Sequence, residues 1–253
     1  MTAKEKQENN QRLFGLLGRN ISYSFSSGYF GEKFEKLQLN NHSYVNFDIP
    51  TIEKFPSLLS QSINGMNVTI PYKQEIIPFL DEIDTEAQEI GAVNTIKFLE
   101  NGKLKGFNTD VYGFKNSLLP LLKPNHTKAL ILGTGGASKA VDYALKSLHI
   151  ETLFVSRSAT VSNQIFYDEL TEEIIADYTI VINCTPLGTF PNVEHCPNIP
   201  YQHITENHLL YDLIYNPSET TFLHKGKKQG AVIKNGLEML KLQAEKSWQI
   251  WNQ

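Results

Sequence analysis

The chain has 253 residues, enough for one large core or two modest ones, and we expect two domains. Its formal net charge is -4, and its lysines are scattered along the chain without forming a basic stripe. This pattern argues against nucleic acid or an anionic membrane as the main partner, so we expect a small solute instead.

The N-terminus "MTAKEKQENNQR" has no apolar core of the kind that a signal peptide needs. No run of the chain reaches the roughly 18 apolar residues of a membrane-spanning helix. We therefore expect a cytoplasmic protein with a loose polar tail over residues 1–12. The only cysteines are Cys184 and Cys196, without a CxxC pair, so neither a disulfide framework nor a metal site is predicted.

The first region mixes predicted strands and helices. In chain order, we expect strands over residues 13–18, 44–49 and 65–70, the start of a helix over 31–37, and a helix over 52–60 interrupted near Pro56. Residues 92–100 and 103–110 flank the dipeptide Asn101-Gly102, which favours a type I′ hairpin turn. This α/β region ends near residue 110.

Apolar strands alternate with helices in the second region. A helix over residues 111–122 ends before Pro124, and an amphipathic helix over 137–148 has apolar residues at spacings of three and four. Strands are expected over residues 128–133, 151–156, 177–184 and 208–215. Strands that are apolar on both faces and alternate with helices predict a parallel, doubly wound sheet.

A final helix follows the last strand of this sheet. It carries one apolar face, formed by Leu237, Leu240, Ala244, Trp248 and Trp251. We expect this face to pack on the first region. One domain would then comprise residues 13–110 and 237–253, and the other would comprise residues 111–236.

Glycines lie directly between a predicted strand and a predicted helix, in the segment Gly133, Thr134, Gly135, Gly136 and Ala137. A turn without side chains lets backbone N–H groups at a helix N-terminus hold a pyrophosphate. The alternative is an ordinary glycine turn that joins strand to helix. The third position of the usual glycine pattern is Ser138, so this is a variant loop.

The end of the following strand favours NADP over NAD. NAD-preferring proteins usually carry an acidic residue there, about 20 residues after the loop. This chain has Ser156, Arg157 and Ser158, and a guanidinium flanked by hydroxyls suits a 2′-phosphate. The alternative is a surface arginine after a strand.

Lys73 follows a predicted strand in "NVTIPYK", where a lysine is most often a solvated surface charge. Reduction of a carbonyl by hydride transfer needs a proton donor, however, and a lysine steadied by a carboxylate can supply one. Asp110 lies at the junction of the two regions, and clefts between domains commonly hold binding sites. Taken alone, Asp110 is also a good N-cap for the next helix.

Eight segments in order resemble the shikimate dehydrogenase family. They are "SFS" at 24–26, "NVTIPYK" at 67–73, "GAVNT" at 91–95, "GFNTDVYG" at 106–113, "GTGGAS" at 133–138, "INCTPLG" at 182–188, "YDLIYNP" at 211–217 and "NGLEMLKLQA" at 235–244. Each is weak alone, but their order across both regions makes the resemblance specific.

The resemblance implies an NADP-dependent enzyme that reduces 3-dehydroshikimate to shikimate in chorismate and aromatic amino-acid biosynthesis. It implies an N-terminal α/β substrate domain, a Rossmann-like NADP domain with a doubly wound parallel sheet, and a C-terminal helix that returns to the first domain. The protein would be a monomer or homodimer.

The resemblance also assigns roles to residues. Lys73 and Asp110 match the catalytic pair, with Lys73 as general acid in reduction. Ser24 and Ser26 match the hydroxyls that hold the substrate carboxylate. The remaining matches are Thr69, Asn94, Tyr215 and Gln243 around the substrate, and Gly133 to Ala137, Ser156 to Ser158, Leu213 and Gly236 at the cofactor. Without the resemblance, the alternatives are a polar loop for the serines, a turn for Asn94, core packing for Tyr215 and solvent exposure for Gln243.

Four positions depart from the family pattern. Tyr23 and Ser27 replace a histidine and a proline beside the serine pair, Val161 replaces a second basic residue, and Phe190 replaces a common methionine. Two alternatives stay open. One is a quinate/shikimate dehydrogenase that prefers NAD. The other is a non-catalytic ligand or dinucleotide sensor, whose usual sign would be the loss of Lys73 or Asp110.

Overall fold

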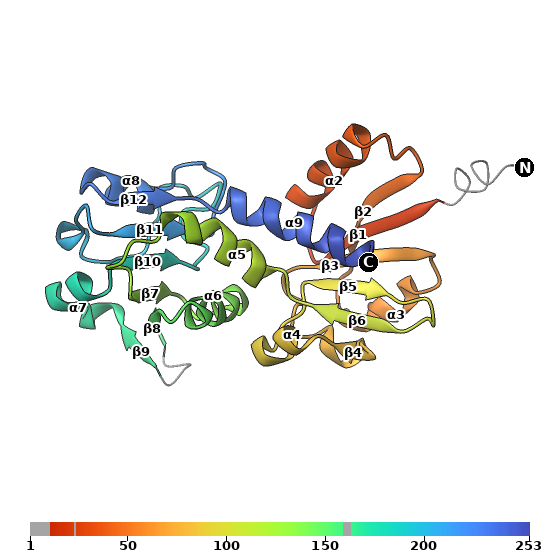
Figure 1. Ribbon diagram of the computed structural model, residues 1–253, viewed down its shortest axis with the longest axis horizontal. Helices are drawn as coiled ribbons and strands as arrows, with labels where there is room; N and C mark the ends of the chain where they lie inside the picture. Colours follow the sequence, from red (N-terminus) through yellow and green to blue (C-terminus); the bar gives the residue numbers. More distant parts are fainter. Residues whose placement is uncertain (1–10, 23, 159–162) are drawn as a thin grey trace, which may run out of the picture. The chain divides into compact units, whose positions relative to one another are not determined.

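The computed structural model describes residues 11–22, 24–158 and 163–253, and it divides into two compact units (Figure 1). Unit 1 runs to Thr109 and includes Gln243–Gln253, and unit 2 comprises Asp110–Leu242. The division therefore falls within the last helix, whereas the sequence analysis places it before that helix. Tyr23, Val161 and most of the predicted tail lie outside the described residues.

Unit 1 is built on a mixed six-stranded sheet in the order β2-β1-β3-β5-β6-β4. Strands β2, β1 and β3 are parallel, whereas β5 is antiparallel to both β3 and β6. The strands are β1 (Arg12–Gly18), β2 (His42–Asp48), β3 (Ile63–Val68), β4 (Glu82–Ile83), β5 (Thr95–Phe98) and β6 (Leu104–Phe107). The helices of unit 1 are α2 (Phe25–Lys36), α3 (Phe55–Leu58) and α4 (Thr85–Ile90), together with the end of α9 (Leu237–Trp251).

An aromatic core joins β1 and α2 to the end of α9 (Leu237–Trp251). The Phe14 ring lies 5.0 Å from the Trp251 ring and 5.5 Å from the Trp248 ring, between centroids. Phe30 and Phe34 of α2 complete this cluster. The apolar face predicted for the last helix thus packs on the first region, and Figure 1 shows the end of α9 beside α2 and β1.

Unit 2 is built on a six-stranded sheet in the order β12-β11-β10-β7-β8-β9, and every adjacent pair is parallel (Figure 1). The strands are β7 (Lys128–Leu132), β8 (Glu151–Ser156), β9 (Gln164–Phe166), β10 (Ile180–Asn183), β11 (Leu209–Asp212) and β12 (Val232–Lys234). The helices are α5 (Asp110–Leu118), α6 (Gly136–Ser147), α7 (Glu172–Asp177) and α8 (Thr221–Lys228). The chain winds outward from β7 in one direction and from β10 in the other, which confirms the predicted doubly wound sheet.

The predicted type I′ turn between β5 and β6 is wrong. Such a turn needs a positive φ at both central residues, but only Gly102 of the dipeptide has one, at 80°. The Gly102 N–H donates to the Leu99 carbonyl at 2.9 Å, and the Asn101 side chain accepts from the Lys103 N–H at 3.1 Å. The loop is therefore a longer turn followed by a left-handed glycine.

Helix α2 begins at Phe25, earlier than the Gly31 start that the sequence predicts. Two exposed glycines, Gly28 and Gly31, weaken the local helix propensity, which conceals the true start in the sequence. The short elements α7, α8, β9 and β12 were not predicted, since each lacks a long periodic pattern.

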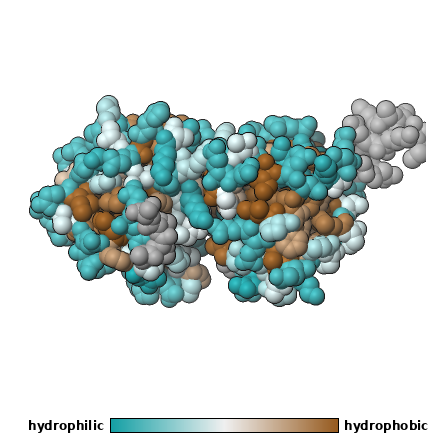
Figure 2. Space-filling view, turned by 90° about the horizontal axis from the view of Figure 1, so that it is seen from below, coloured by the Kyte–Doolittle hydropathy of each residue, from teal (hydrophilic) through white to brown (hydrophobic). Residues whose placement is uncertain are grey.

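Figure 2 shows hydrophilic and hydrophobic residues interspersed over the face in view, with the hydrophobic ones in separate patches. Among the described residues, no helix has the length and apolar character needed to cross a membrane.

We predict that Gly65→Ala destabilises the protein, because a Cβ at Gly65 would lie 2.5 Å from ring atoms of Trp251. Overpacking of this kind costs about 1 to 3 kcal/mol of unfolding free energy. Gly31→Ala is the matched control, since nothing lies within 4 Å of its added Cβ. Urea unfolding checks both variants, and equal stabilities would contradict this account of how α9 packs.

Candidate active site

Ser24 and Ser26 lie at the N-terminus of α2. Ser24 is the N-cap, and its Oγ accepts a hydrogen bond from the Ser26 N–H at 3.2 Å. Burial raises the pKa of the Tyr44 phenol, and the Ser26 side chain partly offsets this effect. The alternative of a polar loop is therefore wrong, because both serines belong to a capped helix start. Such an end carries a partial positive charge that favours a carboxylate.

Thr69 and Lys73 follow the end of β3 in a segment anchored by the backbone. The Thr69 N–H donates to the Leu17 carbonyl at 2.8 Å, and the Lys73 carbonyl accepts from the Val93 N–H at 2.7 Å. Between them, Tyr72 is buried and donates its hydroxyl to the Ile49 carbonyl at 2.8 Å. Lys73 therefore extends from a fixed backbone and is half-buried, so it is not a freely solvated lysine.

Asn94 follows Val93 and is buried, with 4% of its surface exposed. Its Oδ1 accepts from the Thr109 N–H at 2.8 Å and from the Thr109 hydroxyl at 3.1 Å. Because a backbone N–H can only donate, the amide oxygen must face Thr109 and the Nδ2 group must point away. Among the described residues, that nitrogen has no hydrogen-bond partner and is not sealed from solvent.

Asp110 is the first residue of α5 and is buried. The preceding residue, Thr109, therefore occupies the N-cap position, so the structure does not favour the N-cap alternative for Asp110. The adjoining Asn108 donates its side-chain amide to the Ala92 carbonyl at 2.9 Å. The start of α5 is thus tied to the strand connection that also carries Asn94.

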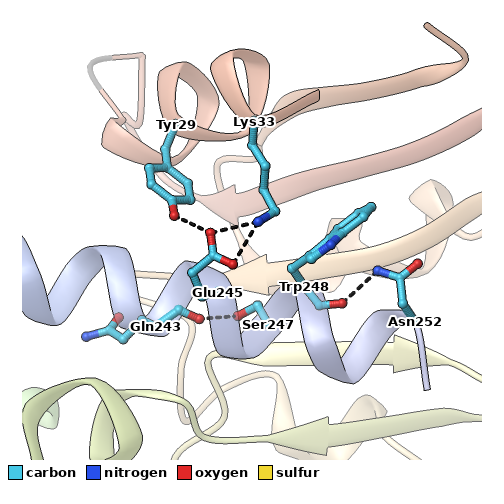
Figure 3. Close-up of polar contacts among 7 residues, drawn as sticks. All are labelled: Tyr29, Lys33, Gln243, Glu245, Ser247, Trp248 and Asn252. Atoms are coloured by element: carbon cyan, nitrogen blue, oxygen red, sulfur yellow. Dashed lines mark hydrogen bonds and ion pairs between the residues drawn. The ribbon is translucent and has the colours of Figure 1, made fainter. Parts of the chain in front are cut away.

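Gln243 lies on α9, half-buried, and its backbone carbonyl accepts from the Ser247 hydroxyl at 3.0 Å (Figure 3). Two residues further on, Glu245 accepts from Lys33 Nζ at 2.7 Å on both oxygens and from the Tyr29 hydroxyl (Figure 3). Burial alone would raise the pKa of Glu245, but the contacts with Lys33 and Tyr29 lower it overall. This ion pair fixes α2 against α9.

The predicted phosphate loop follows β7. Gly133 has a φ of +97°, which a side chain rarely adopts, and its N–H donates to the Val155 carbonyl at 2.8 Å. Gly135 is the N-cap of α6, and a Cβ added to Gly135 or Gly136 would meet nothing within 4 Å. Packing within the protein therefore does not require glycine at these two positions. Their exposed backbone leaves room for a ligand to approach the helix N-terminus.

Thr134 and Ala137 are half-buried parts of the same loop and helix start, and Ser138 is buried. The Ser138 hydroxyl donates to the Gly135 carbonyl at 2.6 Å. The serine at the third glycine position thus stabilises the turn.

Ser156, Arg157 and Ser158 come at the carboxyl end of β8. Ser156 is buried and its hydroxyl oxygen accepts from the Ser158 N–H at 3.4 Å, whereas Arg157 is exposed. An exposed guanidinium held beside a closed serine turn is available to a phosphate group.

Leu213 and Gly236 are brought together at the end of β11. A Cβ on Gly236 would lie 2.1 Å from the Leu213 carbonyl oxygen, so close backbone approach requires glycine here. Tyr215 lies in the same loop and is half-buried, so it is not a core residue.

Sequence reasoning missed the buried carboxylate that holds this loop. Asp212 accepts from the Ile214 N–H at 3.0 Å, from Asn183 Nδ2 at 3.1 Å and from the Thr220 hydroxyl at 2.6 Å. Asp212 is fully buried. The segment "YDLIYNP" contained the signal, since an acidic residue at the end of an apolar strand needs partners.

The predicted residues therefore fall into two groups. Unit 1 contains Ser24, Ser26, Thr69, Lys73, Asn94 and Gln243, while unit 2 contains Asp110, Tyr215 and all the predicted cofactor residues. In unit 2, the cofactor residues follow the carboxyl ends of parallel strands, which share one edge of the sheet. Within the described part of the chain, no cluster of three or more His, Cys, Asp or Glu is placed to hold a metal ion.

These features define a class of protein: a two-unit α/β protein whose parallel sheet has the strand, glycine turn and helix of a dinucleotide-binding site. Residues 16–96 match the family model described as the shikimate dehydrogenase substrate binding domain. A protein of Caldanaerobacter subterraneus named shikimate dehydrogenase (NADP(+)) is 36% identical, and the match covers 97% of this chain and 93% of the relative.

Two solved structures are similar over nearly the whole chain. Shikimate 5-dehydrogenase from Thermus thermophilus, in complex with NADP(H) and shikimate, has a TM-score of 0.84 and 31% identity, covering 96% of this chain and 93% of that one. Quinate dehydrogenase from Corynebacterium glutamicum, in complex with NAD, has a TM-score of 0.83 and 27% identity, covering 96% and 94%. The chain belongs to the shikimate dehydrogenase family.

Asp212 gives a pH-dependent prediction. Burial raises the pKa of Asp212 to about 6, although hydrogen bonds from Thr220, Ile214 and Asn183 favour its ionised form. The folded protein then holds this proton more tightly than the unfolded chain. Unfolding free energy therefore falls as the pH rises from about 4 through about 6, by about 3 kcal/mol for this carboxyl group.

Asp212→Asn does not titrate, so its stability relative to the wild type is expected to rise over this pH interval. Urea unfolding at both ends of the interval measures the difference. Asp168→Asn, at an exposed position of the same unit, controls for the change in net charge. A stability difference that is the same at both pH values would contradict the prediction.

Proposed function

We propose that this protein catalyses the reversible NADP-dependent reduction of 3-dehydroshikimate to shikimate, a step of chorismate and aromatic amino-acid biosynthesis. The observation that carries the proposal is the 36% identity to an NADP-dependent shikimate dehydrogenase over 97% of the chain, with both Lys73 and Asp110 present. The substrate domain is unit 1 and the dinucleotide domain is unit 2.

Lys73 is the general acid in reduction. Hydride addition to the C3 carbonyl carbon leaves negative charge on the carbonyl oxygen, and the Lys73 ammonium transfers a proton to that oxygen as the O–H bond forms. In the reverse direction, the neutral amine accepts the hydroxyl proton. Asp110 is the carboxylate partner of this pair.

The substrate is held by charge and by directed hydrogen bonds. Ser24 and Ser26, at the N-terminus of α2, bind the carboxylate, where the helix dipole adds to the hydroxyl donors. Asn94, Thr69, Gln243 and Tyr215 surround the ring. Asn94 supports this assignment most directly, because its amide nitrogen is turned away from Thr109.

Residues of unit 2 hold the cofactor. The N–H groups at Gly135 and Gly136 would hold the pyrophosphate. Arg157, with Ser156 and Ser158, would bind the 2′-phosphate. Leu213 and Gly236 would contact the rest of the cofactor. The open space at both glycines fits this role. When bound, NADPH supplies the hydride.

One alternative is an enzyme that prefers NAD and acts on quinate as well. The similarity to a quinate dehydrogenase in complex with NAD favours it, and so does the single basic residue at the end of β8. The non-catalytic sensor has no supporting observation, since Lys73 and Asp110 are both present. A cytoplasmic location and a monomeric or homodimeric state stay predictions.

We predict that Lys73→Ala lowers kcat for NADPH oxidation with 3-dehydroshikimate by about 10²- to 10⁴-fold, because the proton donor is lost. The KM for NADPH stays close to the wild-type value. Steady-state absorbance kinetics measures both, and Lys36→Ala, on an exposed turn of α2, serves as the control. Absence of wild-type turnover would contradict the proposed function. A kcat of Lys73→Ala equal to that of the wild type would contradict the role of the lysine.

Arg157→Ala is expected to raise the KM for NADPH about tenfold, since a charge-assisted hydrogen bond contributes about 1 to 2 kcal/mol. The KM for NADH should not change, because NADH has no 2′-phosphate. Lys228→Ala, an exposed lysine of the same unit, controls for the loss of positive charge. Equal effects on both cofactors, or better wild-type rates with NADH, would favour the NAD-preferring alternative.

A further inference from the structure

A hydrogen-bond network with Asn67 at its centre lies within unit 1. Asn67 Nδ2 donates to Ser247 Oγ at 2.9 Å, to Thr95 Oγ1 at 3.1 Å and to the Asn94 backbone carbonyl at 3.3 Å. Asn67 Oδ1 accepts from the Tyr44 hydroxyl at 2.9 Å. One side chain thus links β2, β3, β5 and α9, which are far apart in the sequence.

The orientation of this amide follows from its partners. A backbone carbonyl can only accept, so the nitrogen of Asn67 must face Asn94 and the oxygen must face Tyr44. The Tyr44 hydroxyl has a single proton and donates it to Asn67 Oδ1.

The network reaches two of the residues assigned to the substrate. It meets the backbone of Gln243 through Ser247, a contact drawn in Figure 3. It meets Asn94 twice, since Thr95 Oγ1 also lies 3.1 Å from Asn94 Oδ1. Thr95 and Ser247 are fully buried, so water does not replace these contacts.

We propose that Asn67 is a positioning residue for the substrate site, together with Tyr44, Thr95 and Ser247, which contact it. Hydrogen bonds from the network occupy the backbone carbonyl and the Oδ1 atom of Asn94. Nδ2 is then the side-chain atom of Asn94 that is left to contact a ligand, and it can only donate. The ligand atom at this position must then be an acceptor oxygen. A ring substituent that is a protonated amine would meet a donor and be rejected. This inference rests on the proposed function.

A purely structural role would stabilise the fold without affecting substrate binding selectively. Two substitutions at Thr95 separate the roles. Thr95→Val keeps the side-chain volume but removes the hydroxyl, whereas Thr95→Ser keeps the hydroxyl and removes a methyl group. If the hydrogen bond positions Asn94, substrate binding follows the hydroxyl. If packing alone matters, binding follows the volume.

The experiment measures kcat and both KM values for these variants. Thr95→Val is expected to raise the KM for 3-dehydroshikimate about five- to tenfold, the scale of one lost hydrogen bond, with kcat within about twofold and the KM for NADPH unchanged. Thr95→Ser should keep a KM close to the wild-type value and show a lower Tm.

Thr152→Val is the matched control. Thr152 is a buried strand threonine of unit 2, and its hydroxyl donates to Asp142 Oδ1 at 2.6 Å. Thr152→Val loses the same hydroxyl group and a shorter hydrogen bond than Thr95→Val does, and its KM for 3-dehydroshikimate should not change. A KM for Thr95→Val within twofold of the wild type, or equal KM values for Thr95→Val and Thr95→Ser, would overturn the proposal.

Tyr44→Phe is a second test at the opposite side of the network. It removes the donor to Asn67 Oδ1 and should raise the KM for 3-dehydroshikimate by itself, so this test does not depend on the folding of Thr95→Val. Where both variants fold, their effects on the KM should be non-additive, because both hydroxyls contact Asn67. Tyr201→Phe, which loses a hydrogen bond to the Pro197 carbonyl in unit 2, is its control. An unchanged KM in Tyr44→Phe, or simple additivity, counts against the proposal.

Failure of the proposed function is distinguishable from failure of this inference. If the wild type shows no turnover, calorimetry with shikimate measures binding directly. The same variants should then weaken the Kd in the same order, with Thr152→Val unchanged. Equal Kd values for the wild type and Thr95→Val would overturn the network's role whether or not the protein is an enzyme.

Discussion

The half-buried Asn67 amide has two N–H bonds and a carbonyl oxygen that need partners, and elements of unit 1 far apart in the sequence meet to supply them. An amide sealed from water without partners would cost about 1 to 3 kcal/mol, so the elements that meet it are constrained in position. Its four partners come from β2, from β5 and the residue before it, and from α9.

Apolar and polar contacts make different contributions to the packing of helix α9. The rings of Trp248 and Trp251 pack against Phe14 and supply burial, which has little directional preference. Ser247, immediately before Trp248 in the sequence, adds the directional contacts to Asn67 and to the Gln243 carbonyl. Glu245 joins Lys33 and Tyr29 of α2. The helix is therefore fixed in rotation as well as in position.

In unit 2, a buried carboxylate likewise needs several hydrogen-bond donors. Asp212 at the end of β11 gathers donors from its own loop, from Asn183 of β10 and from Thr220 before α8. The loop that it holds carries Leu213 and Tyr215. In both units a polar side chain at a strand, half-buried in Asn67 and buried in Asp212, joins segments that carry residues of the proposed site.

The sequence predicts the strands and helices with long periodic patterns, including the parallel sheet, the glycine loop and the return of α9. It also contains the motifs that lead to Lys73, Asp110 and Asn94. It does not predict the start of α2, because the N-cap at Ser24 outweighs weak helix propensity. Nor does it predict the Asn67 network, since its members are single polar residues whose proximity arises only from tertiary packing.

The central claim is that Asn94 presents its amide nitrogen to the ligand because the buried network fixes the other groups. Neutron diffraction from deuterated crystals of the protein with shikimate tests this most directly. The account predicts deuterons of Asn94 Nδ2 directed at a ligand oxygen, and the Thr109 N–D directed at Asn94 Oδ1. An Asn94 oxygen that faces the ligand, or an Asn67 oxygen turned toward the Asn94 carbonyl, would contradict it.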